Sequence, residues 1–432
     1  MCIILNTKHM HTMHMVGRFC KYTNFCKTSK NYLPAAEKRN EIFVKKTGNG
    51  VNMAVSQLTD LMQITGTLFF LPSSLPRDGE REGWRCGFYF VILQPETMPF
   101  VADILKHRSL SIVGLEKNTG KTVCLNYILR RLNELRVHVG VTSIGVDGEQ
   151  VDSVFATAKP EITLYEGTHF ITSEKHYLVR QAVSELVAVD SRRTSLGPLV
   201  TARVLVPGKV LLSGAATTGA LREQIKAFDS MGVDLSIVDG ALSRLSLASP
   251  TVTEAMILAT GAAVSPNVKQ LISKTKHLYR LVNLEEVDSA TQTKLNGIES
   301  GLWAIDEQGT THDLGVQSVF LLGSESGNLL RHGTTLFVAG AVSDRLLKLL
   351  TPQKSGITLI ARDFTKIFAT PEVYTDFLRR GHRMQVLQRS KLIAVTLNPT
   401  SPQGYLLDSK STCEALSEAL QTPVYDVKQI EQ

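Results

Sequence analysis

The segment 109–135 constrains the fold more than any other part of the sequence. A short apolar run, Leu110–Val113, ends at Gly114 and leads into the loop sequence GLEKNTGKT. Residues Thr122–Leu135 then repeat leucine and isoleucine at helical spacing. A strand, a glycine-containing loop and an amphipathic helix in this order are typical of a phosphate-binding loop. The sequence therefore predicts a nucleotide-binding α/β domain.

The loop residues have distinct expected roles around ATP and Mg²⁺. Those expected to contact the nucleotide are Glu116, Lys117, Asn118, Thr119, Gly120, Lys121 and Thr122. Glycine at position 120 lets the backbone approach a phosphate, and the Lys121 ammonium supplies charge to the β- and γ-phosphates. The Thr122 hydroxyl is expected to bind Mg²⁺. The alternative is an ordinary strand–helix turn that contains glycine and binds no ligand.

Two aspartates follow strand-like runs and are candidate metal ligands. Asp239 ends the run DLSIVD, so its carboxylate is expected at the carboxyl edge of the sheet, where active sites of open α/β sheets lie. We expect it to hold Mg²⁺ directly or through water, and to act with Lys121 as a catalytic residue. Asp147 in SIGVDGEQVD follows the strand expected over 137–144 and is a second metal candidate. Capping of a helix or turn is the alternative for Asp239, and a simple turn is the alternative for Asp147.

Other polar positions after apolar runs have simpler explanations. Asp190 ends LVAVD and precedes SRRTSLG, which is either a switch region or a solvated turn. Arg362, Asp363 and Asn398 also follow strand-like runs, and turn or capping roles are favoured for them. No base-reading motif such as NKxD is recognised, so the choice between ATP and GTP stays open.

Strands and helices alternate along residues 98–432, which predicts parallel sheets covered on both faces. A polar stretch at 286–299 suggests a connecting helix or linker. We therefore expect a P-loop NTPase domain over 98–285, followed by a second, smaller α/β domain over 286–432. Strands expected in the second domain are 335–339, 357–361, 384–387, 392–396 and 423–427, and its expected helices are 344–350, 371–380 and 411–420.

Residues 1–97 differ from the rest in charge, cysteine content and periodicity. They hold 12 Lys and Arg against 7 Asp and Glu, which is +5 of the chain's net charge of +7. Four of the six cysteines also lie there. We expect a mostly disordered extension, with translation starting at Met98. A basic targeting arm is the rival interpretation.

The composition of residues 98–432 argues against several classes of protein. A net charge of only +2 does not indicate a nucleic-acid-binding body. Two cysteines without a CxxC pair give neither a disulfide framework nor a zinc motif, which favours a reducing cytoplasm. The apolar runs are shorter than the roughly 20 residues that span a bilayer, so no membrane segment is expected.

The loop spacing resembles that of one group of nucleotide-dependent enzymes. Five residues separate Gly114 from Gly120, as in the P-loop of dethiobiotin synthetase and related SIMIBI-class NTPases. The strand end Val238–Ala241 is similar to the V-E-G-A of that family, with Asp in place of Glu. This resemblance covers residues 109–245 and implies a superfamily rather than a reaction.

A longer resemblance covers nearly all of residues 98–432. The strings SLSIVGLEKNTGKTVCLNYILRRL, TSIGVDGE, DLSIVDGALSR, ILATGAAVSP, LIARDFTKIF and KLIAVTLNPTSPQGY resemble the B subunit of the lysine 5,6-aminomutase reactivase. The resemblance implies a cytoplasmic accessory protein that helps restore an adenosylcobalamin-dependent aminomutase after cofactor damage. Its implied partners are lysine 5,6-aminomutase and a MutS-like ATPase subunit. Analogy with SIMIBI-class proteins leaves a homodimer open.

Two other functions remain in competition with this one. The first is a ligase similar to dethiobiotin synthetase, in which ATP phosphorylates a small carboxylate or carbamate and Lys159 in TAKPEI serves the substrate. The second is a nucleotide-sensing module without turnover. ATPase activity stays undecided, because a residue that orients water cannot be recognised in one sequence.

Overall fold

The computed structural model describes residues 3–5, 68–72, 88–92, 98–144, 161–240, 248–316 and 329–430. The chain forms two compact units, Met1–Lys106 and His107–Gln432. In the first unit, β1 (Ile3–Leu5), β2 (Leu68–Pro72) and β3 (Phe88–Ile92) form an antiparallel sheet, and α3 spans Val101–Ile104. The rest of residues 1–97 lies outside the described residues, so the expectation of a disordered extension stays a prediction.

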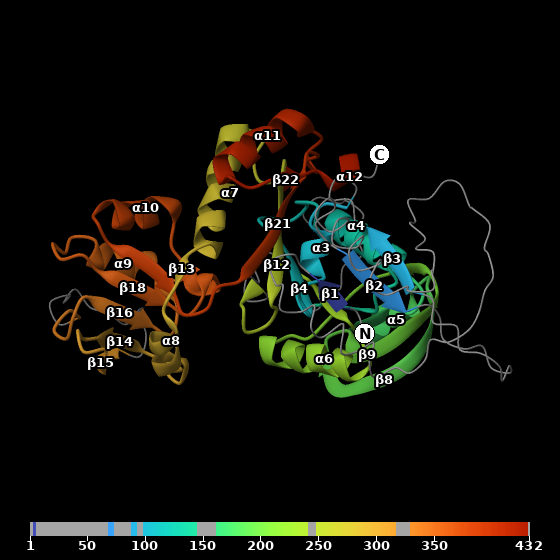
Figure 1. Ribbon diagram of the computed structural model, residues 1–432, viewed down its shortest axis with the longest axis horizontal. Coiled ribbons are helices and arrows are strands. Elements are labelled where there is room, and N and C mark those ends of the chain that lie inside the picture. The colour runs from blue at the N-terminus through green and yellow to red at the C-terminus, as the bar shows by residue number, and fades with distance from the viewer. Residues whose placement is uncertain are drawn as a thin grey trace, which may run out of the picture. The chain divides into compact units, whose positions relative to one another are not determined.

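A nine-stranded, mostly parallel sheet dominates the second unit (Figure 1). Its strands, in spatial order, are β22 (Val424–Tyr425), β21 (Lys391–Asn398), β12 (Ala255–Gly261), β4 (Ser109–Gly114), β11 (Leu235–Asp239), β5 (Val139–Ser143), β7 (His169–Ser173), β9 (Gly197–Val206) and β8 (Val183–Thr194). Neighbouring strands are parallel from β22 to β7, whereas β9 runs antiparallel to both β7 and β8. The expected α/β class is confirmed.

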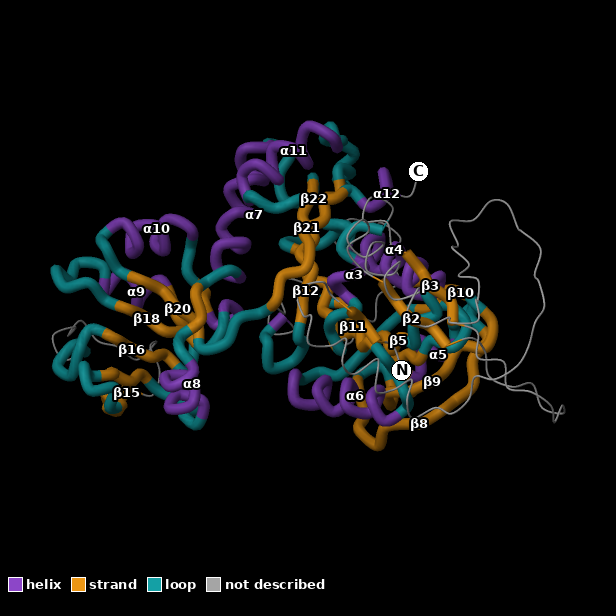
Figure 2. The backbone as a smooth tube through the Cα atoms, viewed as in Figure 1, coloured by secondary structure: helices purple, strands orange, loops and turns teal. Residues whose placement is uncertain are grey.

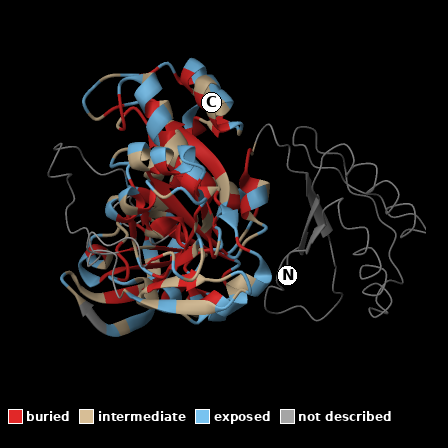
Figure 3. Ribbon diagram, turned by 90° about the vertical axis from the view of Figure 1, so that its left-hand side faces the viewer, coloured by how far each residue is buried: buried red, intermediate tan, exposed pale blue. Residues whose placement is uncertain are grey.

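Helices cover both faces of this sheet, which is why its central strands are apolar throughout. Every residue of β4 and β12 is buried. Helix α4 (Lys121–Glu134) packs against β4 and β11, and α6 (Thr218–Ser230) lies on the opposite side of the strands (Figure 2). The apolar stripe of α6, which includes Leu221 and Ile225, packs on Val238 of β11. Buried residues accordingly run along the strands in Figure 3.

Shorter elements complete this part of the chain. Strands β6 (Ile162–Leu164) and β10 (Gly208–Val210) form an antiparallel pair, and α5 (Glu174–Leu178) follows β7. Helices α7 (Val268–Val282) and α11 (Ser409–Leu420) pack against each other, and α12 (Val427–Ile430) packs against α4. Within the described residues, no helix combines the length and apolarity needed to cross a bilayer.

A second sheet has six strands. Its spatial order is β13 (Glu285–Glu286), β20 (Arg383–Val386), β18 (Thr358–Ala361), β16 (Thr335–Val338), β14 (Leu302–Ile305) and β15 (Thr311–Val316). Its accompanying elements are α8 (Ser289–Asn296), the short strands β17 (Val342–Ser343) and β19 (Ile367–Phe368), α9 (Asp344–Leu350), the 3-10 turn η5 (Phe364–Lys366) and α10 (Pro371–Arg379). Strands β16, β18 and β20 and helices α9 and α10 lie within a residue or two of the ranges expected from the sequence, and α8 lies within the stretch expected as a connecting helix or linker. The other elements of this sheet were not predicted.

The expected division into 98–285 and 286–432 is wrong in one respect. After β20 the chain returns to the nine-stranded sheet, where β21 pairs with β12 and β22 pairs with β21. Residues Ala394–Leu397 of β21 are all buried, so this strand requires cover on both faces. Periodicity along the chain identifies such a strand but does not say which sheet it joins. The second sheet is therefore an insertion between β12 and β21 rather than a C-terminal domain.

Candidate functional site

The loop Leu115–Gly120 connects β4 to α4 at the carboxyl edge of the nine-stranded sheet. Asn118 and Gly120 have left-handed backbones, with φ of 62° and 89°. The Leu115 amide donates to Ala259 O over 2.9 Å, and Thr119 Oγ1 donates to Glu116 O over 2.9 Å. These bonds hold a compact loop in which left-handed residues turn backbone amides toward the helix N-terminus.

Both glycines of the loop motif are required by close contacts. A Cβ at Gly114 would lie 2.2 Å from Thr119 Oγ1, and one at Gly120 would lie 2.8 Å from Asn398 Cβ. The positive φ of Gly120 adds a conformational requirement at the second position. A side chain at either position would therefore displace the loop, its neighbours or both.

Lys121 and Thr122 are the first two residues of α4, as the sequence predicts. The Lys121 ammonium donates to Glu116 O over 3.3 Å, so it lies along the loop that it follows. A helix of 14 residues places partial positive charge and unbonded amides at this end. Together with the lysine, this end of the helix can stabilise an anion.

The side chains of Glu116 and Lys274 form an ion pair beside the loop. Lys274 Nζ of α7 lies 3.6 Å from Glu116 Oε1 and also donates to Val264 O over 3.1 Å. Because a carboxylate repels phosphate, the Glu116 side chain is a poor phosphate ligand in this position. Any contribution of Glu116 to anion binding would come from its backbone.

Asp239 lies where the sequence predicts, at the end of the strand next to β4. It is in register with Ile112 of β4 and with Ser143 of β5, whose hydroxyl donates to Asp239 O over 3.1 Å. Burial raises the pKa of the Cys124 thiol to about 12, the Asp239 carboxylate adds to the rise, and a hydrogen bond with Thr396 lowers it.

Asp147, the second metal candidate, lies outside the described residues, as does Lys159. Within the described ranges, no group of three or more His, Cys, Asp or Glu side chains is arranged to hold a metal ion. Asp190 does not form the solvated turn favoured from the sequence, because it lies inside the edge strand β8. The turn of the β8–β9 hairpin is at Ser195 and Leu196, and the antiparallel register of this hairpin could not be deduced from an apolar run alone.

Arg362 and Asp363 have structural roles, in line with the capping roles favoured from the sequence. Arg362 donates to Ile298 O and to Ala339 O, the latter over 3.4 Å. Asp363 accepts from the Thr365 amide at the start of η5.

Asn398 is the site residue whose importance the sequence did not reveal. It ends β21, and its side-chain amide donates to Asn118 O over 3.0 Å and to Thr400 O over 3.1 Å. It therefore holds the loop from a strand 280 positions away in sequence. Its one sequence signal was an asparagine–proline pair after an apolar run. Unless the order of strands in the sheet is known, an asparagine that holds the loop cannot be distinguished from one that only forms a turn.

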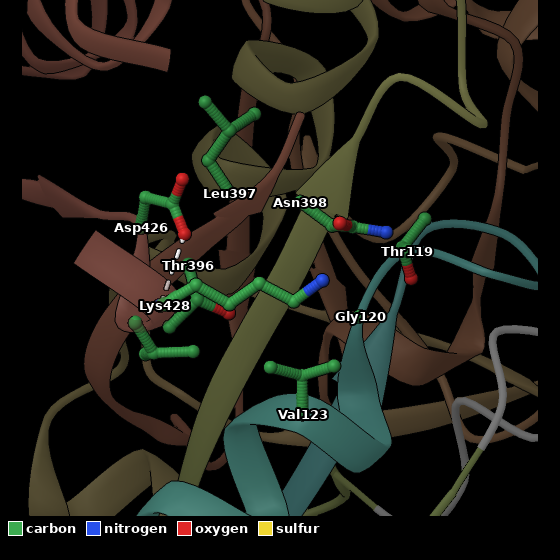
Figure 4. Close-up of a pocket in the computed structure, with 9 residues that line it drawn as sticks. Thr119, Gly120, Val123, Thr396, Leu397, Asn398, Asp426 and Lys428 are labelled. Atoms are coloured by element: carbon green, nitrogen blue, oxygen red, sulfur yellow. Dashed lines mark hydrogen bonds between the residues drawn. The ribbon is translucent and has the colours of Figure 1, made fainter. Parts of the chain in front are cut away.

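A recess lies beside the loop on the β21 side (Figure 4). Its lining residues are Thr119, Gly120, Val123, Thr396, Leu397, Asn398, Asp426, Val427 and Lys428. The Asp426 carboxylate already accepts bonds from Ser409 Oγ, at 2.6 Å, and from the Lys428 amide, at 3.0 Å. The Lys428 side chain extends across the recess in Figure 4. The loop thus has Asp239 on one side and a partly polar recess on the other.

Comparisons of the chain with protein-family models, with curated proteins and with solved structures gave no match.

Proposed function

We propose that residues Leu115–Thr122 bind the phosphates of a nucleoside triphosphate in a P-loop NTPase domain. The observation that carries this proposal is the loop between the buried strand β4 and the N-terminus of α4. Its left-handed residues, its two sterically required glycines and the ammonium of Lys121 form a cradle suited to an anion.

The magnesium ion that accompanies such a nucleotide would be held by Thr122 and Asp239. Mg²⁺ commonly binds one or two carboxylates, with phosphates and water completing its shell, so a cluster of three acidic or histidine side chains is not needed. Thr122 is the second residue of α4, and Asp239 ends the strand beside β4, from which the loop leads to that helix. The bound ion would neutralise phosphate charge, and Asp147 remains a candidate third ligand.

ATP is the nucleotide that we propose, because the resemblance to the reactivase B subunit implies an ATP-dependent process.

The biological role that we propose is ATP-dependent reactivation of lysine 5,6-aminomutase, in which this chain acts with a MutS-like ATPase subunit. This role rests on the sequence strings that resemble the reactivase B subunit, several of which lie at the site: the loop, the end of β11 and the end of β21. Nucleotide binding can order loops around a phosphate and so drive release of a damaged cofactor. The ligase and nucleotide-sensing alternatives share the same loop.

The test is recovery of cofactor-damaged aminomutase supplied with ATP, Mg²⁺, fresh adenosylcobalamin and the MutS-like subunit. Wild-type protein should restore activity, whereas Lys121→Ala should not. Equal recovery by both proteins would contradict a role for the loop. Efficient ATP-dependent turnover of a small carboxylate by the chain alone would favour the ligase.

A further inference from the structure

The hairpin β8–β9 carries most of the exposed apolar surface in the part of the chain that the structure describes. Of the eleven large apolar residues exposed there, eight lie between Leu178 and Val206. Six lie on the hairpin itself, and Leu178 and Val179 lie at the end of α5, which packs against β9; the exposed fractions are 42–74%. The six are Val183, Leu186, Val187, Val189, Leu205 and Val206. In Figure 3 the hairpin, at the bottom of the view, is mostly exposed or half-buried. Apolar side chains gathered in this way mark an interaction surface.

Strand β8 is also the last strand of the nine-stranded sheet, and among the described strands it pairs with β9 alone. One side of its backbone therefore presents N–H and C=O groups that no other strand of the sheet bonds. Globular proteins usually protect such an edge with charged residues, proline or cover from another element. Strand β8 has charged residues and three register shifts, both of which protect an edge, but its central residues Leu186–Val189 are uncharged and exposed.

We propose that this hairpin is the interface between two copies of the chain, with the two β8 strands paired antiparallel about a two-fold axis near Leu186–Val189. When two copies of β8 pair antiparallel, the apolar run Leu186–Val189 of one copy faces the same run of the other, so the surface is self-complementary. Strand β8 carries Glu185, Asp190, Arg192 and Arg193, two charges of each sign, and Glu185 is paired within its own hairpin with Arg203, at 2.6 Å. The strand thus has no net charge that would select an oppositely charged partner.

The exposed area is also appropriate for a dimer. The six leucine and valine residues of the hairpin, each about half exposed, offer roughly 500 Å² per copy, and Leu178 and Val179 bring this to roughly 700 Å², against about 800 Å² per partner in a standard interface. Backbone pairing along β8 would add directional bonds to this burial. The proposal is independent of nucleotide binding, because none of these residues belongs to the loop or the recess.

Sedimentation of the full-length protein at tens of micromolar tests the proposal. Wild type should sediment as a dimer, and the double variant Leu186→Lys, Val189→Lys as a monomer with unchanged thermal stability. Both side chains are exposed, so the lysines should be tolerated in the fold. Leu406→Lys is the matched control, since Leu406 is 72% exposed and lies elsewhere, and it should remain dimeric.

A cysteine at position 187 supplies a second readout. Residues near a two-fold axis of paired strands meet their own copies at Cα distances that a disulfide can bridge. Val187→Cys should therefore form a covalent dimer on mild oxidation, whereas Glu418→Cys on α11 should not. A monomeric wild-type protein would overturn the proposal. If the β8 amides of that monomer were protected from hydrogen exchange, another segment of the same chain would be identified as their cover. A double-lysine variant that stays dimeric would also overturn it.

Discussion

Replacement of Lys121 by alanine is the most direct test of the loop. In the structure the Lys121 ammonium donates a hydrogen bond to Glu116 O, at 3.3 Å, and the residue is half-buried. A phosphate oxygen about 4 Å from this charge would interact with it by about 4 kcal/mol at an effective dielectric of 20. Binding the phosphate would replace the hydrogen bond from Lys121 to Glu116 O, which reduces this gain by about 1 kcal/mol. The expected loss is therefore about 2–3 kcal/mol, or roughly 30- to 150-fold in affinity.

Isothermal titration with Mg²⁺-ATP at fixed ionic strength measures this loss. Lys348→Ala is the matched control, because Lys348 is an exposed lysine on α9 and its removal changes the net charge by the same amount. That variant should bind like wild type, and both variants should melt within a few degrees of it. Indistinguishable affinities for Lys121→Ala and Lys348→Ala would refute the assignment of the loop to phosphate binding.

Three further predictions follow from residues around the loop. Gly120→Ala should lower the thermal midpoint by several degrees and weaken ATP binding, because the new Cβ would lie 2.8 Å from Asn398 Cβ and the backbone is left-handed. Gly219→Ala, which adds a Cβ in open space, should change neither the thermal midpoint nor ATP binding. Asp239→Asn should raise the Mg²⁺ concentration needed for half-maximal nucleotide binding, and an unchanged magnesium titration would exclude Asp239 from the metal site. Burial raises the pKa of Cys124 to about 12, so the thiol ionises at a lower pH in the unfolded chain than in the folded protein. The free energy of unfolding should therefore fall by up to about 1.4 kcal/mol per pH unit between pH 9 and 12. Cys124→Ala should show a shallower decline in alkaline denaturation experiments, and an equal slope would contradict this origin.

The local sequence pattern was sufficient to predict the strand, the loop and the helix around Lys121. The expected helix 122–135 corresponds to α4, Lys121–Glu134, because its leucines repeat with the period of a helix that packs on a sheet. Asp239 was predicted for a related reason, since parallel strands share a carboxyl edge. These features depend on short stretches of sequence and on a general rule of α/β sheets.

Features that depend on long-range pairing could not be predicted. The run LIAVTL indicates a buried strand but does not indicate pairing with β12, so the role of Asn398 was missed. The run LVAVD looks like a parallel core strand, yet Asp190 belongs to an antiparallel edge strand with bulges in its register. In both cases the same apolar run fits either strand position equally well, and only the identity of the partner strand distinguishes the two.

The return of β21 and β22 to the nine-stranded sheet has a consequence for synthesis of the protein. The loop emerges from the ribosome early, but Asn398, which holds it, follows 280 positions later. Until then β12 lacks the neighbour that covers its outer edge, and the recess beside the loop lacks most of its lining. A growing chain can therefore complete the six-stranded sheet, all of whose strands precede β21, before the proposed nucleotide site is complete. Truncated or stalled products that end before β21 would then carry the loop without the Asn398 contact that holds it.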